Sequence, residues 1–315
     1  MVSLAFSVKY PATDAMARGM SKRPILPETR RKAAIAILPY YLKAKNGLGD
    51  IPLDDLDWPI GRPAGLTGTR ISDLDATDQL LTYPRFWAYR PMPANVRAKL
   101  SLMLVEPWAF HRHHYLLARM LHRRFHRILT CDKRLIAAIP NGIYFVFGDS
   151  WAKDWRTADR RKTRMLSLIA SKKKTLKGHK LRHRIARRLI ETGKDADVIG
   201  GGYRPFADKS EGLAPYRYSV VIENSRQPGY FTEKLVDALL LETVPIYWGA
   251  PDIADFFNPK GMMICESEAE ILKAVAEMSE ADYQARAAAI AENRKTAARY
   301  ADAAKSAALV LGNNL

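Results

Sequence analysis

The sequence contains no run of about 18 consecutive apolar residues, the length that a membrane-spanning helix requires. Residues 1–10 lack the basic start, apolar core and cleavage site of a signal peptide. Only two cysteines occur, Cys131 and Cys265, and they form no metal-binding pattern. The sequence allows a disulfide between them but favours two reduced cysteines. We therefore expect a cytoplasmic location, either in solution or at the inner membrane surface.

Acidic residues are too few in the first two thirds of the chain to balance the basic ones. Residues 211–315 contain 10 Lys and Arg against 15 Asp and Glu, so the net charge of +17 means that residues 1–210 carry +22. All 7 histidines also precede residue 184. An excess of this size predicts an anionic partner, which could be a diphosphate, a phospholipid, an anionic glycan or a nucleic acid.

Apolar runs alternate with helical segments, which is typical of an α/β protein. With 315 residues, 48% of them hydrophobic, the chain is long enough for two domains. Residues 178–190 predict an amphipathic helix, and residues 267–278 and 281–309 predict alanine-rich helices. The expected buried strands span residues 33–38, 100–105, 143–147, 165–170, 218–222, 244–248 and 261–265.

The clearest local pattern lies in residues 218–249. A strand, a polar loop and a helix capped by Thr232 lead to a second strand at residues 244–248. This is a βαβ unit, which places both strands in a parallel sheet. Ligands of such sheets bind beyond the carboxyl ends of the strands. The polar residues that fall there are Glu223, Asn224, Ser225, Tyr230, Glu233 and Lys234.

Glu233 and Lys234, in the first turn of that helix, suit a nucleotide sugar. The free N–H groups of a helix start attract phosphate, and the Lys234 ammonium adds a full charge. The Glu233 carboxylate can accept hydrogen bonds from sugar hydroxyls. The alternative is that both are ordinary solvated charges, which are common on helix surfaces.

The same stretch resembles the signature of the family 10 glycosyltransferases, the α1,3/4-fucosyltransferases. The similarity lies in Glu-Asn-Ser at 223–225, Gly-Tyr-Phe-Thr-Glu-Lys at 229–234, Asp-Ala at 237–238 and Val-Pro-Ile-Tyr-Trp-Gly-Ala-Pro at 244–251, and it continues through 255–260. The resemblance implies a GT-B fold, in which two Rossmann-like domains face a central cleft. It also implies an inverting transfer of L-fucose from GDP-fucose to a hydroxyl of a GlcNAc-containing glycan, without metal or cofactor, with α1,3 linkage as the family default.

By matching position, the resemblance assigns donor contacts to Asn224, Tyr230, Glu233 and Lys234. It places Arg182, near the start of the helix at 178–190, against the diphosphate, where a guanidinium can pair two phosphate oxygens at once. Gly201 belongs to a three-glycine turn, which either admits a ligand close to the backbone or is merely flexible. The further candidates for donor binding are Glu223, Ser225, Gly201 and Thr232.

Glu106 directly follows the buried strand at 100–105, where an α/β protein places catalytic groups. In the family, a glutamate after an equivalent strand is the general base, so we expect Glu106 to deprotonate the acceptor hydroxyl. The sequence Glu106-Pro107 differs from the family's turn, and the alternative is a glutamate that caps the next segment. The aromatic residues that could stack on an acceptor sugar, or belong to the core, are Trp108, Tyr115 and Trp151.

Three parts are expected along the chain. Residues 1–152 would form the acceptor-binding domain, with the link between domains near residues 148–151. Residues 153–285 would bind the GDP-sugar, and residues 255–260 would form the base-side wall of its pocket. Residues 286–315 would form a helix that crosses back to the first domain.

Metal binding has weaker sequence support. Asp55-Leu56-Asp57 and Asp73-Leu74-Asp75 are short acidic motifs in turn-like surroundings. His122 and His126 have the spacing of a helical metal site but no acidic or cysteine partner. We therefore assign no metal ligand.

The competing hypothesis is a basic protein without catalysis that binds nucleic acid or a membrane surface. It depends on the charge excess and on residues 110–127, which are rich in histidine and arginine. No nucleic-acid motif or interleaved aromatic pattern accompanies that charge, so we expect contact with an anionic membrane rather than with nucleic acid. The acceptor, the linkage position and the oligomeric state are not predicted.

Overall fold

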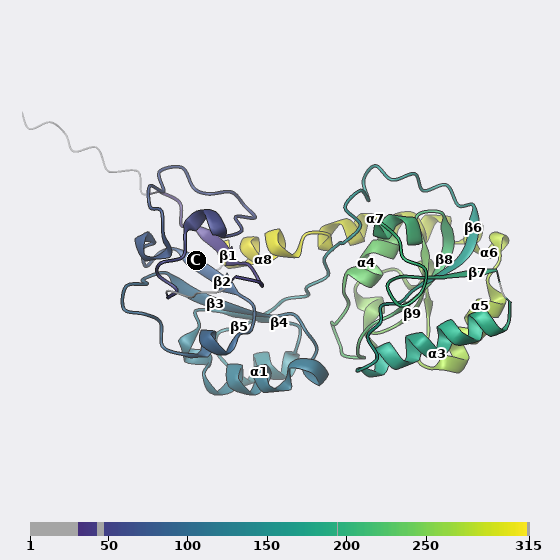
Figure 1. Cartoon of the computed structure of the whole chain (residues 1–315), viewed down its shortest axis with the longest axis horizontal. Coiled ribbons are helices and arrows are strands. Elements are labelled where there is room, and N and C mark those ends of the chain that lie inside the picture. The colour runs from purple at the N-terminus through teal and green to yellow at the C-terminus, as the bar shows by residue number, and fades with distance from the viewer. Residues whose placement is uncertain (1–30, 43–46, 194, 314–315) are drawn as a thin grey trace, which may run out of the picture.

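The computed structural model describes residues 31–42, 47–193 and 195–313, which form two parallel β-sheets side by side (Figure 1). The first expected domain therefore begins outside the described residues.

The first sheet holds β1 Ile35–Leu38, β2 Gln79–Thr82, β3 Lys99–Leu104, β4 Ile128–Thr130 and β5 Gly142–Tyr144. The second holds β6 Arg164–Ile169, β7 Ala196–Ile199, β8 Tyr216–Ile222, β9 Val244–Trp248 and β10 Met263–Ile264. The α-helices are α1 Trp108–Met120, α2 Lys133–Ala138, α3 Lys177–Glu191, α4 Glu233–Leu240, α5 Glu268–Glu277, α6 Glu280–Ala285, α7 Ala287–Ala297 and α8 Ala303–Gly312.

The first sheet is wound on one side only. Its five strands are parallel and lie in chain order, from β1 to β5. Alternate strand residues such as Ala36, Leu80 and Leu102 face a core built from the connections between strands, including α1 and α2. Right-handed crossovers that all proceed in one direction place every connection on the same face of a sheet. The other face must therefore be covered from elsewhere in the chain.

That other face is covered by α8, at the far end of the chain. Ile35 and Ile37 of β1 pack with Ala307, Ala308 and Leu311 in a core of their own, and Figure 1 shows α8 beside β1. The return of the C-terminal segment removes an apolar sheet face from water. The alanine-rich helix expected over residues 281–309 is divided into α6, α7 and α8, and α8 starts anew because the side chain of Asp302 caps it.

The second sheet is wound on both sides, with the strand order β10-β9-β8-β6-β7. Helices α3 and α5 cover one face, and α4 and α7 cover the other. From β6 the chain passes through α3 to β7 at the edge of the sheet, and then returns to β8 on the opposite side of β6. Such a reversal leaves a crevice beyond the carboxyl ends of the two strands that flank it.

The connection between the sheets begins where β5 ends. The buried strand expected at residues 143–147 is wrong in its limits, because β5 ends at Tyr144 and is a partly exposed edge strand. The backbone N–H of Asp149 donates to the carbonyl of Tyr300 at 2.7 Å, and Gly148 packs against the same tyrosine. The outgoing connection and the returning C-terminal segment are thus joined between the two sheets.

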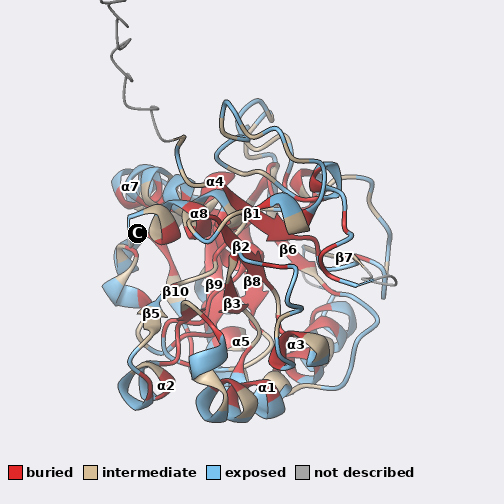
Figure 2. Ribbon diagram, turned by 90° about the vertical axis from the view of Figure 1, so that its left-hand side faces the viewer, coloured by how far each residue is buried: buried red, intermediate tan, exposed pale blue. Residues whose placement is uncertain are grey.

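The central strands of both sheets are largely buried, the edge strands β5, β7 and β10 are partly exposed, and exposed residues gather on the outer helices and loops (Figure 2). The architecture confirms the predicted α/β class, with two Rossmann-like units. Within the part of the chain that the structure describes, every helix is too short or too polar to span a bilayer.

Candidate active site

A cleft of about 920 Å³ opens where the carboxyl ends of the two sheets meet. One wall comes from residues that follow β1, β2 and β3, together with the start of α1. The other comes from residues that follow β6, β7 and β8, together with the starts of α3 and α4. The switch point of the second sheet, between β6 and β8, therefore opens directly into the space between the domains.

The start of α4 is held by a buried carboxylate beneath it. Thr232 caps the helix, as predicted, by accepting a hydrogen bond from the backbone N–H of Lys234. The backbone N–H and the hydroxyl of Thr232 donate to Glu223 at 2.9 and 2.7 Å. Glu223 is fully buried and does not line the cleft. Its role in this geometry is to orient Thr232, which does line the cleft.

Lys234 and Glu233 form a charged pair at the mouth of that helix. The Lys234 ammonium lies 2.9 Å from a Glu233 carboxylate oxygen, 3.0 Å from the Thr232 hydroxyl and 3.8 Å from Glu223. Burial alone would lower the pKa of Lys234, but Glu233 and Glu223 outweigh it and the pKa is raised. Burial alone would likewise raise the pKa of Glu233, but Lys234 and Lys209 lower it. Both groups are therefore charged at neutral pH.

The start of α3 contributes a second group of polar side chains. Arg182 is buried at the base of the cleft, and its guanidinium donates to the carbonyl of Ile222 at the end of β8. Burial lowers the pKa of Arg182 from its very high ordinary value. His179, one turn earlier, accepts a hydrogen bond through Nδ1 from the backbone N–H of Leu176 at 3.2 Å. Burial and the charge of Arg182 lower the pKa of His179, so its ring is neutral.

Asn224 and Tyr230 line the cleft between these two helix starts. The Oδ1 atom of Asn224 is buried and makes no hydrogen bond of good geometry with the described residues, although the side chain lies close enough to His179 to raise the pKa of that ring. Buried polar atoms are nearly always paired, so such an atom beside a cleft indicates a site for a donor group of a ligand. Burial and nearby carboxylates raise the pKa of Tyr230, which keeps its hydroxyl protonated.

Glu106 enters the same cleft from the first sheet, two residues after the end of β3. Burial raises the pKa of its carboxyl group, and Lys234 partly opposes that rise. Asp149, on the connection between the sheets, also lines the cleft, and burial raises its pKa. The cleft therefore holds two carboxyl groups that bind protons more tightly than an ordinary surface carboxylate does.

The three-glycine turn after β7 has two distinct parts. Gly200 has φ +110° and packs against the carbonyl of Ala170, so a side chain there would collide with the backbone. Gly201 lines the cleft, and a Cβ atom on it would meet nothing within 4 Å. The fold itself thus requires glycine at position 200, while Gly201 leaves room beside the cleft.

Several predicted contacts lie outside the cleft lining. Tyr115 is buried and donates from its hydroxyl to the carbonyl of Glu106 at 3.0 Å, so it supports that residue instead of stacking on a sugar. Phe257, expected in the base-side wall, packs in the core against Phe231 and Tyr300. The other predicted contacts that do not line the cleft are Ser225, Trp108 and the rest of residues 255–260. The motifs to which no ligand role was assigned also lie outside it: Asp55, Asp57, Asp73, Asp75, His122 and His126.

Sequence reasoning missed part of the cleft. His179, Lys173 and Asp149 line it beside the predicted residues, as does Trp151, which was predicted. The position of His179 at the start of the predicted helix at 178–190 was a usable signal, because that helix follows a parallel strand. Asp149 had no such signal, since only the path of the connection between domains brings it to the cleft.

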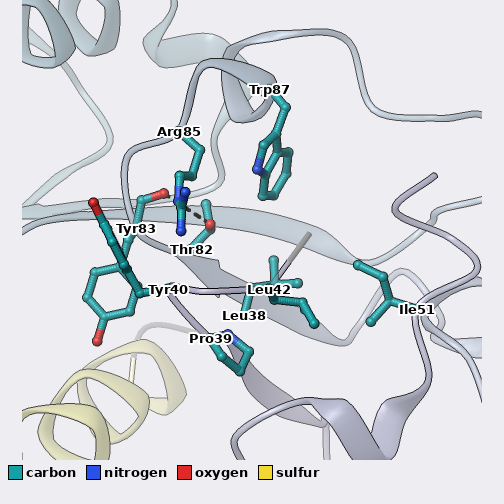
Figure 3. A pocket seen from close by; sticks show the side chains of 9 residues that line it. All are labelled: Leu38, Pro39, Tyr40, Leu42, Ile51, Thr82, Tyr83, Arg85 and Trp87. Carbon is teal, nitrogen blue, oxygen red and sulfur yellow. Dashed lines mark hydrogen bonds between the residues drawn. The ribbon is translucent and has the colours of Figure 1, made fainter. Parts of the chain in front are cut away.

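Two tyrosines form part of the first-sheet wall, and an arginine packs on one of them. The rings of Tyr40 and Tyr83 meet edge to face, with centroids 5.8 Å apart, and both line the cleft. The guanidinium of Arg85 lies 4.1 Å from the Tyr40 ring centre (Figure 3). The small cavity beneath them has about 10 Å³ of space, room for a water molecule and not for a sugar.

The comparisons with known proteins match this part of the chain. Residues 159–280 match the model of glycosyltransferase family 10 (fucosyltransferase), C-terminal part. Alpha-(1,3)-fucosyltransferase FucT of Helicobacter pylori is 45% identical over 56 residues, which are 18% of this chain and 12% of that protein. GDP-fucose protein O-fucosyltransferase 3 of Bos taurus is 41% identical over 56 residues, again 18% and 12% of the two chains. The match thus spans about an eighth of the length of either relative.

Among solved structures, TarM is similar with a TM-score of 0.51 and 9% identity, over 76% of this chain and 55% of that chain. That likeness concerns the fold alone.

Proposed function

We propose that the protein transfers L-fucose from GDP-fucose to a hydroxyl of a glycan, with inversion, because residues 159–280 match the model of the C-terminal part of glycosyltransferase family 10. One observation carries the proposal: a single cleft joins Glu106 of the first sheet to Arg182, Asn224 and Lys234 of the second. A carboxylate thus faces a cationic, helix-capped site, as an acceptor base must face a leaving diphosphate.

The diphosphate of the donor would lie against the starts of α3 and α4. Both helices begin at this edge of the sheet, and the free N–H groups of a helix start attract phosphate. Arg182 and Lys234 supply full positive charges in a largely buried setting, where electrostatic stabilisation of a leaving group is strong. Asn224, whose buried Oδ1 makes no hydrogen bond of good geometry within the described residues, would accept one from the nucleotide or the sugar.

The chemical step needs one proton acceptor and one stabilised leaving group. Glu106 accepts the proton of the acceptor hydroxyl. At the same time, the oxygen of that hydroxyl forms a bond to C1 of fucose from the face opposite GDP. The bond between C1 and the β-phosphate oxygen breaks, and its electron pair remains on GDP. Arg182, Lys234 and the helix starts stabilise the charge that develops there, without a metal ion.

The acceptor would enter from the first-sheet side of the cleft. Tyr40, Phe110 and Trp151 are exposed and line it, so their rings are available to pack on a sugar. We keep a GlcNAc-containing glycan and an α1,3 linkage as the proposed acceptor chemistry. One relative is a GDP-fucose protein O-fucosyltransferase, so peptide acceptors belong in the same screen. Free buried thiols at Cys131 and Cys265 support the proposed cytoplasmic location.

Binding and transfer measurements test this proposal together. The wild-type protein should bind GDP by calorimetry and transfer fucose from GDP-fucose, but not mannose from GDP-mannose, to a panel of GlcNAc-containing glycans. Lys234→Ala should lose GDP affinity by at least about tenfold, because a partly buried charge that faces the diphosphate is removed. Lys295→Ala, at an exposed cation of α7 outside the cleft, is the matched control. Folded wild-type protein with no affinity for GDP would overturn the proposal.

A further inference from the structure

Two segments of the chain are strongly basic and contain no acidic residue. Residues 107–131 include five arginines, and residues 171–190 include nine lysines and arginines. The first segment forms α1 and its flanks on the first sheet, and the second forms α3 and its flanks on the second sheet. The proposed transfer reaction uses only Arg182 among these fourteen cations.

Helix α1 presents a mixed basic and apolar face to water. Its exposed residues include Arg112, Leu116, Arg119 and Met120, which follow helical spacing, and Arg123 is exposed in the turn just after the helix. Leu116 is 53% exposed and Met120 is 76% exposed, and no described residue forms an ion pair with these arginines. Large apolar side chains between cations are typical of helices that lie in the interface of a membrane.

Helix α3 carries a groove of about 440 Å³ along its exposed side. Arg184 pairs with Glu268 at 2.7 Å, but the other cations of the groove have no ion-pair partner among the residues that the structure describes. Ile190 is 59% exposed at one end of the groove. The residues that line it are Lys174, Lys180, His183, Arg184, Arg187, Ile190 and Tyr203.

The two helices lie on the same side of the molecule. Both α1 and α3 run along its lower edge in Figure 1 and again in Figure 2, which is turned by 90° about the vertical axis. Both segments also reach the mouth of the cleft, because Phe110 and His111 of α1 and Lys173 before α3 line it. The exposed residues of these two segments, here called the basic face, therefore extend across both domains beside the cleft.

We propose that the basic face docks on the surface of an anionic phospholipid bilayer. Several cations without partners complement the headgroup charge, and each adds to binding within roughly a Debye length of the surface. The exposed Leu116, Met120 and Ile190 distinguish this surface from one that binds nucleic acid, since aliphatic side chains gain free energy in a lipid interface and have no role against phosphates. Docking in this orientation would place the mouth of the cleft beside the membrane.

Vesicle flotation with the full chain tests the proposal. Binding is compared, at about 0.1 M salt, between vesicles of phosphatidylcholine alone and vesicles that also contain anionic phosphatidylglycerol. The wild-type protein should float only with the anionic vesicles. A variant with K174E, K180E and R187E should bind them at least about tenfold more weakly. A variant with L116S and M120S should also bind more weakly, which charge attraction alone would not produce.

The matched control reverses three exposed cations on the opposite side of the molecule, with K295E, R299E and K305E. It changes the net charge by the same amount, and α7 and α8, which carry or flank these residues, lie away from the lower edge in both views. Equal losses in the two triple variants would overturn the proposal, because net charge would then explain the binding. Binding to heparin or DNA without any binding to anionic vesicles would also overturn it.

The outcome is independent of the proposed reaction. None of the substituted residues lies in the donor or acceptor site, so the vesicle variants should keep wild-type affinity for GDP. Vesicle binding without GDP affinity would support the docking surface and reject only the transferase proposal. GDP affinity without vesicle binding would support the transferase proposal and reject only the docking surface.

Discussion

Gly178 lies so close to Glu223 that a Cβ atom on it would overlap the Glu223 carbonyl oxygen. Its backbone N–H donates to the carbonyl of Asn224 at 3.2 Å. This contact joins the first turn of α3 to the end of β8 and so sets the distance between the starts of α3 and α4. The proposed diphosphate site depends on that distance.

Gly178→Ala should therefore separate the two helix starts. We expect a loss of roughly 1–3 kcal/mol of unfolding free energy, as for other overpacked sites, together with weaker GDP binding. Urea denaturation and calorimetry measure the two effects. Gly201→Ala is the control for stability, since a Cβ atom there meets nothing within 4 Å. A Gly178→Ala protein with unchanged stability would show that α3 can shift without cost.

Glu106→Gln should separate binding from chemistry. GDP affinity should persist, while transfer falls about 10²- to 10⁴-fold, the usual contribution of a general base. Burial raises the pKa of Glu106, and the base must be deprotonated, so kcat/KM should fall with decreasing pH at a higher pH than for an ordinary carboxylate. The pH profile of kcat/KM for the wild-type protein measures this fall on the acidic side. If transfer survives in Glu106→Gln but is lost in Asp149→Asn, the base is Asp149.

Asp237 holds the connection between the sheets against α4. The Ser150 hydroxyl donates to it at 2.7 Å, the backbone N–H of Trp151 donates at 3.0 Å, and Lys209 pairs with it at 2.6 Å. Asp237→Ala should cost about 3–5 kcal/mol of unfolding free energy, because a largely buried ammonium loses its partner. Asp237→Asn should cost less, since its amide oxygen can still accept. Thermal and urea denaturation measure the difference, and equal losses would contradict this view of the pair.

Lys162 makes stability depend on pH. Its ammonium donates to the carbonyls of Ala214 and Leu241 at 2.8 and 2.7 Å, and burial lowers its pKa to about 7. The unfolded chain keeps the proton up to about pH 10.5, so it binds more protons than the folded state between about pH 7 and 10.5. Unfolding free energy should therefore rise with pH in that window. Lys162→Met should abolish the rise, and a wild-type curve that is flat from pH 7 to 9 would contradict the assignment.

Transfer should not depend on a divalent ion if cationic side chains stabilise the leaving group. The rate with GDP-fucose should be the same in excess EDTA as in buffer. Loss of activity that Mn²⁺ restores would show that a metal, and not Arg182 and Lys234 alone, faces the diphosphate. Magnesium and calcium, added separately to treated protein, serve as controls for ionic strength.

Local sequence predicted much of the donor side. A buried strand, a capped helix and a second strand within residues 218–249 predict one βαβ unit, and the structure contains it as β8, α4 and β9. Because a helix that follows a parallel strand starts at the carboxyl edge, Thr232, Glu233 and Lys234 were expected together at one place. The same reasoning placed Arg182 on a helix that follows β6.

Local sequence could not distinguish residues that line the cleft from buried residues that hold the lining residues in place. Glu223 and Asn224 are neighbours in one motif, yet Glu223 turns beneath Thr232 and is fully buried, while Asn224 lines the cleft. Adjacent residues at the end of a strand point to opposite faces, and which face holds the ligand depends on how the domains meet. Local sequence left Tyr115 open between core and acceptor site, and it placed Phe257 at the site although that ring packs in the core. The reason is similar, since an aromatic side chain has the same local signal in a core and at a binding site.

The amino-acid sequence by itself determined the α/β class, the capped helix with its charged first turn and the excess of basic residues, because each depends on residues close together in the chain. Only the tertiary structure decided that Glu106 and Asp149 share a cleft with Lys234, that α8 closes the bare face of the first sheet and that α1 and α3 form one basic face. These relationships join residues far apart in the chain, so they depend on the strand order of each sheet and on the way the two sheets face each other.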